Sequence, residues 1–466
     1  MTKSFLLLVS ASAFALALTV GPVVAQTPAP TPPDSQANLK PLINSGGKEL
    51  HFDWPMLKIG TGEYSEGPTG VTVFSFDKKV MAAVDVRGGA PGTVNTDLAR
   101  LGYPTSDFDA VVFAGGSAYG LESTTAVASA LKDDGRNTGN WDSIAVALGA
   151  IIFDYGDRRL NEIYPDKKLA QAAYRAAQPG VFRNGAAGAG RMTMSGYFFG
   201  CKAHSGQGGA FRQIGDLKIA VFTVANPYGV VVNRDGKLAA CYNDAGWPAN
   251  ITVNDLMHNL PESRKAGWAT PSGPMHNTTI SLVVVNQKMD AAELQRLAIQ
   301  VHTSMARGIQ PFSTMNDGDA LYAVSTGEIE AEKGIADSTE IGAIASDLMW
   351  DAILNSVPAQ DPLPVITPQP AVSAKALAGY AGDYRFSNFV TVSVTEKDGK
   401  LFGRATGARK AFNVPLDQAV ELVPSGPGTF AVPGRYPTVL DFNQSGTLVM
   451  NPGLWKQTGI KQKAKK

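Results

Sequence analysis

Short apolar runs alternate with amphipathic segments between residues 57 and 355, and this alternation predicts a mixed α/β domain. Each predicted strand is a compact apolar or β-branched run that ends near Gly, Asp or Asn. The expected strands are residues 81–86, 110–113, 144–147, 219–225, 280–285 and 321–325.

The clearest helix signal follows Asp290, which fits an N-cap, with Glu293 as its partner in an Asp form of the capping box. The next apolar positions lie on one face of a helix: Leu294, Leu297, Ala298, Val301 and Met305. Gly308 and Pro311 are expected to end it. His302 lies within this helix and is predicted to be an ordinary side chain, because nothing nearby completes a catalytic triad.

A cluster of five prolines between residues 358 and 370 disfavours both helix and central strand, so residues 358–374 are predicted to be a linker. Beyond it, period-two alternation from Phe389, a turn at Lys397-Asp-Gly-Lys400 and a second run from Leu401 predict a hairpin. Residues 375–466 are therefore expected to form a small all-β, barrel-like domain. Their opening, residues 377–386, resembles the lipocalin-like barrel appended to some serine hydrolases, which implies an accessory role.

The amino terminus predicts export. Residues 1–25 contain Lys3, an apolar run and the small or compact residues before position 26, as in a cleaved signal peptide. The alternative is a retained anchor, but polar residues and Gly21 interrupt the run before it reaches about 20 apolar positions. Residues 26–50 begin with a proline-rich stretch and are expected to be a tether before a domain at 51–357. The mature protein is therefore predicted to be periplasmic or secreted, without a membrane segment.

Charge and composition exclude several partners. The 466 residues include 41 basic and 41 acidic side chains, so the electrostatic basis for binding nucleic acid is missing. The five histidines show no metal-ligand spacing, and we expect no metal or organic cofactor. The two cysteines, Cys201 and Cys241, could form one disulfide or remain two buried thiols, and spacing does not decide between these.

Two glycine-rich stretches each follow a predicted strand: Val-Arg-Gly-Gly-Ala-Pro-Gly-Thr at 86–93 and Phe-Ala-Gly-Gly-Ser-Ala-Tyr-Gly-Leu at 113–121. Both could form backbone amide nests. Neither matches the dinucleotide or P-loop fingerprints. The simpler interpretation is that the glycines permit tight turns and close strand approach.

A third segment, residues 276–286, places two threonines at the start of a β-branched strand. Threonines commonly begin strands, and this is the simpler interpretation. If the peptide bond before Thr279 were cut, however, the new α-amine would lie beside the Thr279 hydroxyl. An α-amine has a pKa of about 7.7–8.0, so it can act as the general base for that hydroxyl.

A fourth segment, Asn316-Asp-Gly-Asp319, lies between the capped helix and the strand at 321–325. Carboxylates two residues apart on an extended segment point the same way, and Asp317 and Asp319 could orient a hydroxyl and an ammonium group. The spacing alone favours a solvated Asp-Gly turn. An EF-hand calcium loop is disfavoured because its later ligands are absent.

Taken in order, six motifs resemble the L-aminopeptidase/D-esterase (DmpA-like) family over roughly residues 57–327. They are the stretches 85–93, 115–121, 152–154, 224–226, 277–280 and 317–319. The resemblance implies a self-processing N-terminal-nucleophile hydrolase with an αββα sandwich shared with the ornithine acetyltransferases. It also implies small peptide or amide substrates and homo-oligomers of cleaved heterodimers.

The resemblance assigns roles to individual residues. The cleaved bond falls between Thr278 and Thr279, with Thr279 as the nucleophile for self-cleavage and hydrolysis. Asn226 matches the asparagine that stabilises the oxyanion. Asp317 and Asp319 match the acidic positions, where some relatives have Ser-Gly-Glu.

Two positions depart from the family pattern. Phe153 stands where some relatives have tyrosine, and Tyr155 could substitute for it. A lysine is missing from the stretch that ends at Ser195, where Arg191 could supply the charge without being equivalent. The segment 241–275 is expected to be a long solvated loop suited to cleavage. Two other functions stay open: an acyltransferase of the ornithine acetyltransferase type, and a non-catalytic periplasmic binding protein.

Overall fold

The structure is a computed structural model that describes residues 38–463 apart from 104–106, 137–138, 243–250, 261–276, 332–334, 365, 367–372 and 435. The predicted signal peptide lies outside the described residues, as do part of the proline-rich linker and most of the expected cleavage loop. Within the described ranges, no helix combines the length and hydropathy needed to cross a bilayer.

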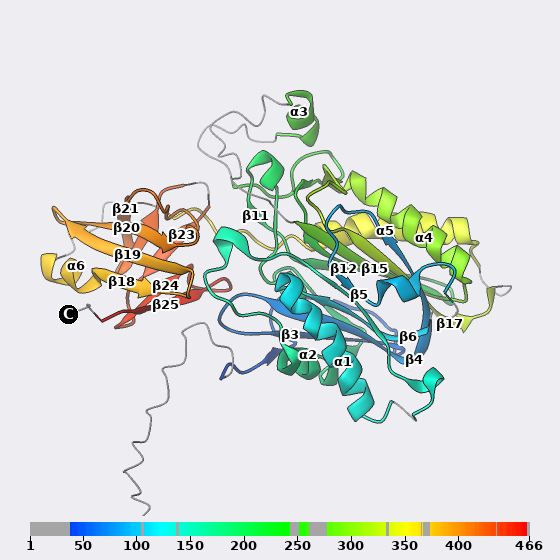
Figure 1. Cartoon of the computed structure of the whole chain (residues 1–466). Coiled ribbons are helices and arrows are strands. Elements are labelled where there is room, and N and C mark those ends of the chain that lie inside the picture. The colour runs from blue at the N-terminus through cyan, green and yellow to red at the C-terminus, as the bar shows by residue number, and fades with distance from the viewer. Residues whose placement is uncertain are drawn as a thin grey trace, which may run out of the picture. The chain divides into compact units, whose positions relative to one another are not determined.

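Two layers of β-structure form the first domain (Figure 1). Strand β4 (Gly70–Val86) links them, because residues 70–76 pair with β3 (Leu57–Glu63) whereas residues 81–86 pair with β17 (Ala320–Ile329). The first layer also contains β6 (Asp107–Ala114) and β7 (Ala147–Ile151), and the second contains β12 (Gln207–Ile214), β13 (Leu217–Asn226) and β15 (Thr278–Gln287). The resulting hydrogen-bonded order is β12-β13-β15-β17-β4-β6-β7-β5, with β5 at Thr93–Val94.

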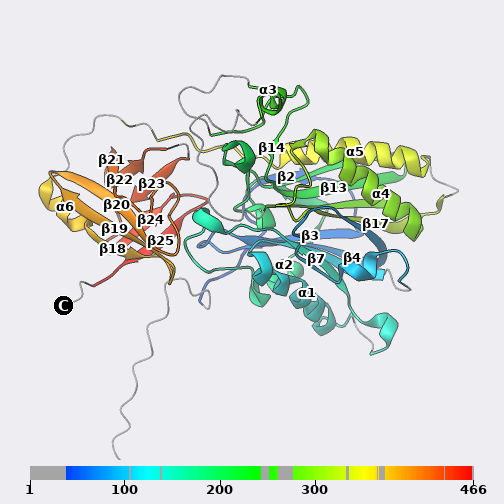
Figure 2. The same cartoon turned by 45° about the horizontal axis from the view of Figure 1, so that its top comes forward.

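Helices cover the outer faces of both layers (Figures 1 and 2). The pair α1 (Glu122–Asp133) and α2 (Lys167–Arg175) packs on the first layer, and the pair α4 (Ala291–Ser304) and α5 (Ser338–Asn355) packs on the second. Between the layers lies an aromatic core with Phe74, Phe113, Phe182 and Phe222. This arrangement confirms the predicted αββα sandwich.

Strand β15 is buried on both faces, as expected for the centre of such a sandwich. Ile280, Leu282 and Val284 face the core between the layers, whereas Val283 and Val285 face α4 and α5. Its neighbours are β13, which runs antiparallel, and β17, which runs parallel. The strand therefore holds its first residues rigidly from both sides.

Short pairs of strands complete the domain. They include β1 (Leu42–Ile43), β2 (Lys48–His51), β8 (Gln178–Pro179), β9 (Val181–Asn184), β10 (Met194–Ser195), β11 (Ala203–His204), β14 (Val230–Val231) and β16 (Ile309–Gln310). Strands β1 and β2 pair with β3 and β9. The ordered domain thus begins before residue 51, within the range predicted to be a tether.

Most of the expected elements are present. The capping box of Asp290 and Glu293 at α4 is confirmed, and a 3₁₀ turn at Met305–Arg307 leads to Gly308. The strand predicted at 144–147 is wrong, because β7 begins only at Ala147. Gly149 interrupts the apolar run of this strand, so the hydrophobic pattern did not predict it. Glycine is required at position 149 because a Cβ would lie 1.8 Å from Thr124 Oγ1 on α1.

The carboxy-terminal residues form a closed eight-stranded barrel, which confirms the predicted β domain. Helix α6 (Ala374–Tyr380) precedes it. The predicted hairpin is β19 (Val390–Lys397) and β20 (Lys400–Gly407), paired through Lys397 and Lys400. The other strands are β18 (Gly382–Arg385), β21 (Val420–Gly426), β22 (Thr429–Val432), β23 (Thr438–Asp441), β24 (Thr447–Met450) and β25 (Gln457–Lys461).

Buried polar contacts join the barrel to the sandwich domain. Trp455 stacks on His204 with ring centroids 3.5 Å apart and donates a hydrogen bond to the Arg191 carbonyl. Gln457 accepts from the Leu160 amide at 2.6 Å and donates to the Arg158 carbonyl at 2.8 Å. The barrel is therefore part of the packed structure around residues 158–204.

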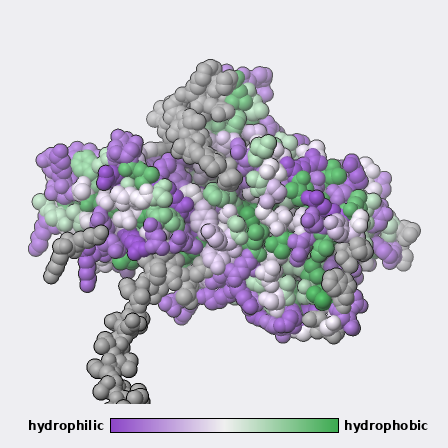
Figure 3. Space-filling model, viewed as in Figure 1, coloured by the Kyte–Doolittle hydropathy of each residue, from purple (hydrophilic) through white to green (hydrophobic). Residues whose placement is uncertain are grey.

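A disulfide joins Cys201 to Cys241, which resolves the alternative that spacing left open. Helix α3 (Val253–His258) follows Cys241, so part of the expected long loop is helical. On the molecular face shown in Figure 3, hydrophilic and hydrophobic residues are interspersed. Exposed large apolar side chains, such as Tyr119 and Met315, are spread over several elements.

Candidate active site

Thr279 lies at the start of β15 and is fully buried. Its backbone N–H donates to Asp319 Oδ1 at 2.6 Å. Its hydroxyl oxygen is buried and has no hydrogen-bond partner among the described residues. A buried hydroxyl without a partner is uncommon, because it costs free energy that a structural threonine would avoid. The backbone of the expected nucleophile is thus held by Asp319, while its hydroxyl makes no hydrogen bond to any described residue.

The two predicted carboxylates lie directly beside this residue. Asp319 accepts from the Ser313 amide in addition to Thr279, and Asp317 accepts from the Tyr228 amide and from the Thr314 amide and hydroxyl. Both carboxylates are almost completely buried. The solvated turn favoured by spacing is therefore wrong, because amides from separate segments replace water around both side chains.

Burial sets the protonation of this pair. It raises the pKa of Asp319 well above its usual range, and the nearby Asp317 carboxylate raises it further. Burial also raises the pKa of Asp317, against the opposing effect of its hydrogen bonds from Thr314 and Tyr228. Asp319 is therefore the carboxyl that most favours holding a proton. A neighbouring ammonium group would lower the pKa of Asp319 and favour its charged form.

The first glycine-rich stretch is packed against the acidic segment. The Arg87 and Gly88 amides both donate to the Asp319 carbonyl. A Cβ at Gly88 would lie 2.2 Å from the Asp319 nitrogen and 2.4 Å from the Asp317 oxygen. The close-approach interpretation is thus confirmed at Gly88, where a larger residue would displace the carboxylates.

Asn226, the last residue of β13, lies on the other side of β15 from the acidic segment. Its side chain donates to the Phe153 carbonyl at 3.0 Å and accepts from the Met194 amide at 3.2 Å. It is paired with Thr278, and directly opposed residues of an antiparallel pair project to the same face. The structure thus brings Asn226 to Thr278, while the Thr279 side chain projects to the opposite face.

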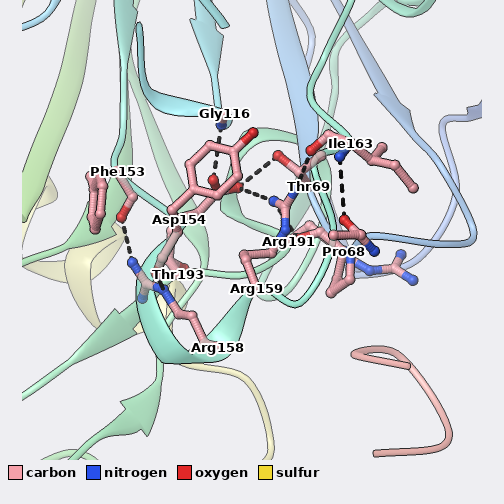
Figure 4. A network of polar contacts seen from close by, with 12 residues as sticks. Pro68, Thr69, Gly116, Phe153, Asp154, Arg158, Arg159, Ile163, Arg191 and Thr193 are labelled. Atoms are coloured by element: carbon pink, nitrogen blue, oxygen red, sulfur yellow. Dashed lines mark hydrogen bonds and ion pairs between the residues drawn. The ribbon is translucent and has the colours of Figure 1, made fainter. Parts of the chain in front are cut away.

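The segment after β7 carries Phe153 and its neighbours (Figure 4). The Phe153 carbonyl accepts from Arg158 as well as from Asn226. Asp154 is buried and accepts from Thr69, from the Gly116 amide and from Arg159. The second glycine-rich stretch thus contains a turn at Gly116, whose φ is 83°. The hydrogen bond from the Gly116 amide to Asp154 connects this turn to the segment after β7.

Arg191, which was expected to be able to replace the charge of the missing lysine, is paired with a buried carboxylate. Its guanidinium contacts the Glu63 carboxylate and donates to the Leu454 carbonyl of the barrel. Glu63, which is buried, and the barrel together determine where the Arg191 guanidinium lies.

Three further charged residues near the site were missed from the sequence. Asp154 lies in the 152–154 motif but was given no role there, whereas Arg158 and the barrel residue Arg409 carry no motif or spacing signal, and Arg409 is separated from the others by more than half of the chain. Their proximity depends on the packing of the barrel against the sandwich domain. His302 is buried and hydrogen bonded to Asp85, consistent with the structural role expected for it.

Comparison with known proteins now bears on this geometry. The family model of Peptidase family S58 matches residues 52–366. The chain belongs to this family. The match includes all four predicted site residues and confirms the resemblance to the L-aminopeptidase/D-esterase enzymes. As a member of peptidase family S58, the protein is a hydrolase of peptide or amide bonds, which disfavours the binding-protein and acyltransferase alternatives.

Individual relatives of this S58 chain differ in their described substrates. A 6-aminohexanoate-oligomer endohydrolase of Paenarthrobacter ureafaciens is 38% identical over 340 residues, which cover 70% of this chain and 90% of that one. An uncharacterized aminopeptidase of Mycobacterium leprae is 33% identical over 309 residues, covering 62% and 82%. The solved L-aminopeptidase D-Ala-esterase/amidase of Ochrobactrum anthropi has a TM-score of 0.46 and 16% identity, covering 67% and 88%. The barrel strands lie beyond the residues matched to the S58 family.

Proposed function

We propose that this protein is an exported, self-processing aminopeptidase or amidase whose nucleophile is the Thr279 hydroxyl. The observation that carries the proposal is the buried hydroxyl of Thr279, which has no hydrogen-bond partner among the described residues and lies beside a backbone nitrogen held by Asp319. The expected substrates are short peptides or amides with a free amino terminus. Linear amino-acid oligomers belong to this class, since 6-aminohexanoate-oligomer endohydrolases are relatives.

The first stage is cleavage of the chain between Thr278 and Thr279. The Thr279 hydroxyl attacks the Thr278 carbonyl carbon, and its proton passes to the Thr279 nitrogen as the C–N bond breaks. Water then hydrolyses the resulting ester, which leaves a carboxyl group on Thr278 and a free α-amine on Thr279. Asn226 lies opposite Thr278, the residue whose carbonyl is attacked. An oxyanion donor in such a position contributes about 2.7–4 kcal/mol in other enzymes.

The second stage is hydrolysis of substrate. The Thr279 amine accepts the hydroxyl proton as the oxygen attacks the substrate carbonyl, and the leaving amine takes up a proton. An acyl ester on Thr279 results, and water releases the acid. Asp319, which accepts from the Thr279 nitrogen in the uncut chain, is positioned to orient the new amine and to stabilise its charged form.

Three variants test the proposal. Thr279→Ala should abolish both self-cleavage and hydrolysis, whereas Thr279→Ser should retain both because it keeps a hydroxyl. Thr278→Ala is the matched control, since the attacked carbonyl belongs to the backbone and cleavage should continue. Intact mass and amino-terminal sequencing of the purified proteins would show whether a fragment begins at Thr279.

Two outcomes would contradict the proposal. One is normal processing of the Thr279→Ala protein. The other is a wild-type chain that stays uncut during prolonged incubation yet hydrolyses amides, because such activity could not use an amino-terminal threonine. Amide hydrolysis is measured on aminoacyl amides and short β-peptides, so that processing and turnover are read separately.

A further inference from the structure

Three neighbouring arginines, of which Arg158 is linked to Asn226, form what we call the arginine cluster: Arg158, Arg159 and Arg409. The first two follow β7 in the sandwich domain, and Arg409 lies in the barrel just after β20. Arg158 and Asn226 donate to the same carbonyl oxygen, that of Phe153. The cluster therefore begins within two hydrogen bonds of the proposed oxyanion donor.

The side chains of Arg158 and Arg159 bind the backbone and Asp154 of the segment that follows β7 (Figure 4). Arg158 donates to the carbonyls of Phe153 and Tyr155. Arg159 is completely buried, pairs with Asp154 at 3.1 Å and donates to the Ile163 carbonyl. These contacts fix the position of two positive charges at the edge of the site.

Arg409, like Arg158 and unlike Arg159, pairs with no carboxylate among the described residues. Its guanidinium stacks over Phe389 of the barrel, 4.1 Å from the ring centroid, and donates to the Arg159 carbonyl. Its Nε is buried and has no hydrogen-bond partner among the residues that the structure describes. Burial and the charge of Arg159 lower the pKa of Arg409 to about 10, so the group is still a cation at neutral pH.

Nearby carboxylates do not balance these charges. Asp154 is already paired with Arg159, and Asp157 is shared by Lys202 and Lys410 at 3.4 and 3.3 Å. The remaining carboxylate, Glu162, is exposed to solvent. The five cations named here therefore outnumber the three carboxylates by two, although Asp157 and Glu162 partly offset the charge of Arg409. A partly buried guanidinium without a counter-ion is costly, and a planar carboxylate is a matching partner for it.

Tyr155 provides an aromatic surface beside Arg159, Arg409 and Phe153. Its ring centroid is 4.9 Å from the Arg159 guanidinium, 6.0 Å from that of Arg409 and 6.3 Å from the ring of Phe153. Tyr119, which packs edge-on to Tyr155, is 66% exposed. The cluster is therefore connected to solvent along an aromatic surface that suits the apolar part of a substrate.

The charges around β15 are arranged with a polarity. The acidic pair Asp317 and Asp319 adjoins the β17 side of β15, whereas Asn226, which shares the Phe153 carbonyl with Arg158 of the cluster, lies on the β13 side. An aminopeptidase substrate has the same polarity, with an amine on the acyl portion and a carboxylate at the far end of the leaving portion. The two patterns match if the leaving portion extends toward the cluster.

We propose that Arg409, supplied by the barrel, binds the terminal carboxylate of the substrate's leaving portion and thereby selects short amides that end in a free acid. This inference rests on the proposed function. It gives the barrel a direct part in substrate recognition, with Arg158 and Arg159 adding positive potential and Tyr155 covering the intervening chain.

The kinetic test compares the linear dimer of 6-aminohexanoate with the same dimer bearing a terminal carboxamide. Loss of a charge-assisted hydrogen bond predicts that the wild-type enzyme prefers the free acid by about ten-fold or more in kcat/KM, mainly through KM. Arg409→Gln should remove this preference and leave hydrolysis of the carboxamide within about two-fold of wild type. Arg404→Gln, which changes an exposed arginine of β20, is the matched control and should keep the preference.

Two kinetic results would overturn the inference. One is a wild-type enzyme that hydrolyses the acid and the carboxamide equally well. The other is an Arg409→Gln protein that loses activity equally on both, because such a loss would indicate a structural role in seating the barrel. Thermal unfolding of each variant identifies proteins that are merely misfolded.

A binding test works even if neither dimer is hydrolysed, which would refute the proposed function alone. Titration calorimetry with hexanoate and hexanamide should show about ten-fold tighter binding of the acid to wild-type protein. Arg409→Gln should bind the two equally, and Arg404→Gln should resemble wild type. Equal binding of hexanoate and hexanamide to wild-type protein would overturn the carboxylate site.

Discussion

Gly88 offers a sharp test of how the acidic pair is positioned, because a single methyl group would occupy space that the backbone of that segment fills. The Cβ of Gly88→Ala would lie 2.2 Å from the Asp319 nitrogen, and ordinary contacts begin near 3.4 Å. The segment must therefore move by about 1 Å, and a misplacement of that size can lower a rate by about 10²-fold. Overpacking should also cost about 1–3 kcal/mol of stability.

The assay follows self-cleavage of Gly88→Ala by intact mass over time, together with the thermal midpoint of the purified protein. Gly379→Ala is the matched control, since a methyl group added at Gly379 in α6 would meet no atom within 4 Å and should be tolerated. Cleavage of Gly88→Ala at the wild-type rate with an unchanged midpoint would refute the claim that this close approach positions Asp319.

Two further predictions concern stability. Burial and Asp317 raise the pKa of Asp319, so the folded state binds that proton more tightly than the unfolded chain, and this contribution to stability falls as pH rises from about 4 toward the raised pKa. In urea unfolding across this range, Asp317→Asn should show a smaller fall than wild type; a larger fall would contradict the assignment. Replacing Cys201 and Cys241 by serine should cost about 2–4 kcal/mol and make unfolding insensitive to reductant, whereas wild-type unfolding that ignores reductant would argue against the bridge.

Local patterns predicted the elements that local physics determines. The capping box at Asp290 and the hairpin around Lys397 each depend on residues a few positions apart, so the sequence contains the full signal. The ordered motifs also pointed to Thr279 and the acidic pair, which the structure brings into contact. Strand β7 escaped because Gly149 weakens an apolar run for a reason, contact with α1, that lies outside the strand.

The parts that could not be predicted depend on contacts between distant segments. An Asp-Gly-Asp sequence is typical of exposed turns, and only the approach of Gly88 and the amides of Ser313 and Tyr228 make Asp317 and Asp319 buried groups. The position of Arg191 likewise depends on Glu63 and on the barrel, neither of which spacing relates to it. Where a further domain such as the barrel contacts the family domain, the role of a side chain can be assigned only from the tertiary structure.

The order of strands in the sheet has a consequence for the reversibility of folding. A cut before Thr279 would place β15 and β17 on one polypeptide and their outer neighbours, β13 and β4, on the other. The two polypeptides would be interleaved within one sheet, and the disulfide would lie wholly within the first of them. After denaturation, the original sheet could form again only if two separate molecules met. The sheet of the cleaved enzyme would thus form while the chain is still a single polypeptide, before the cut.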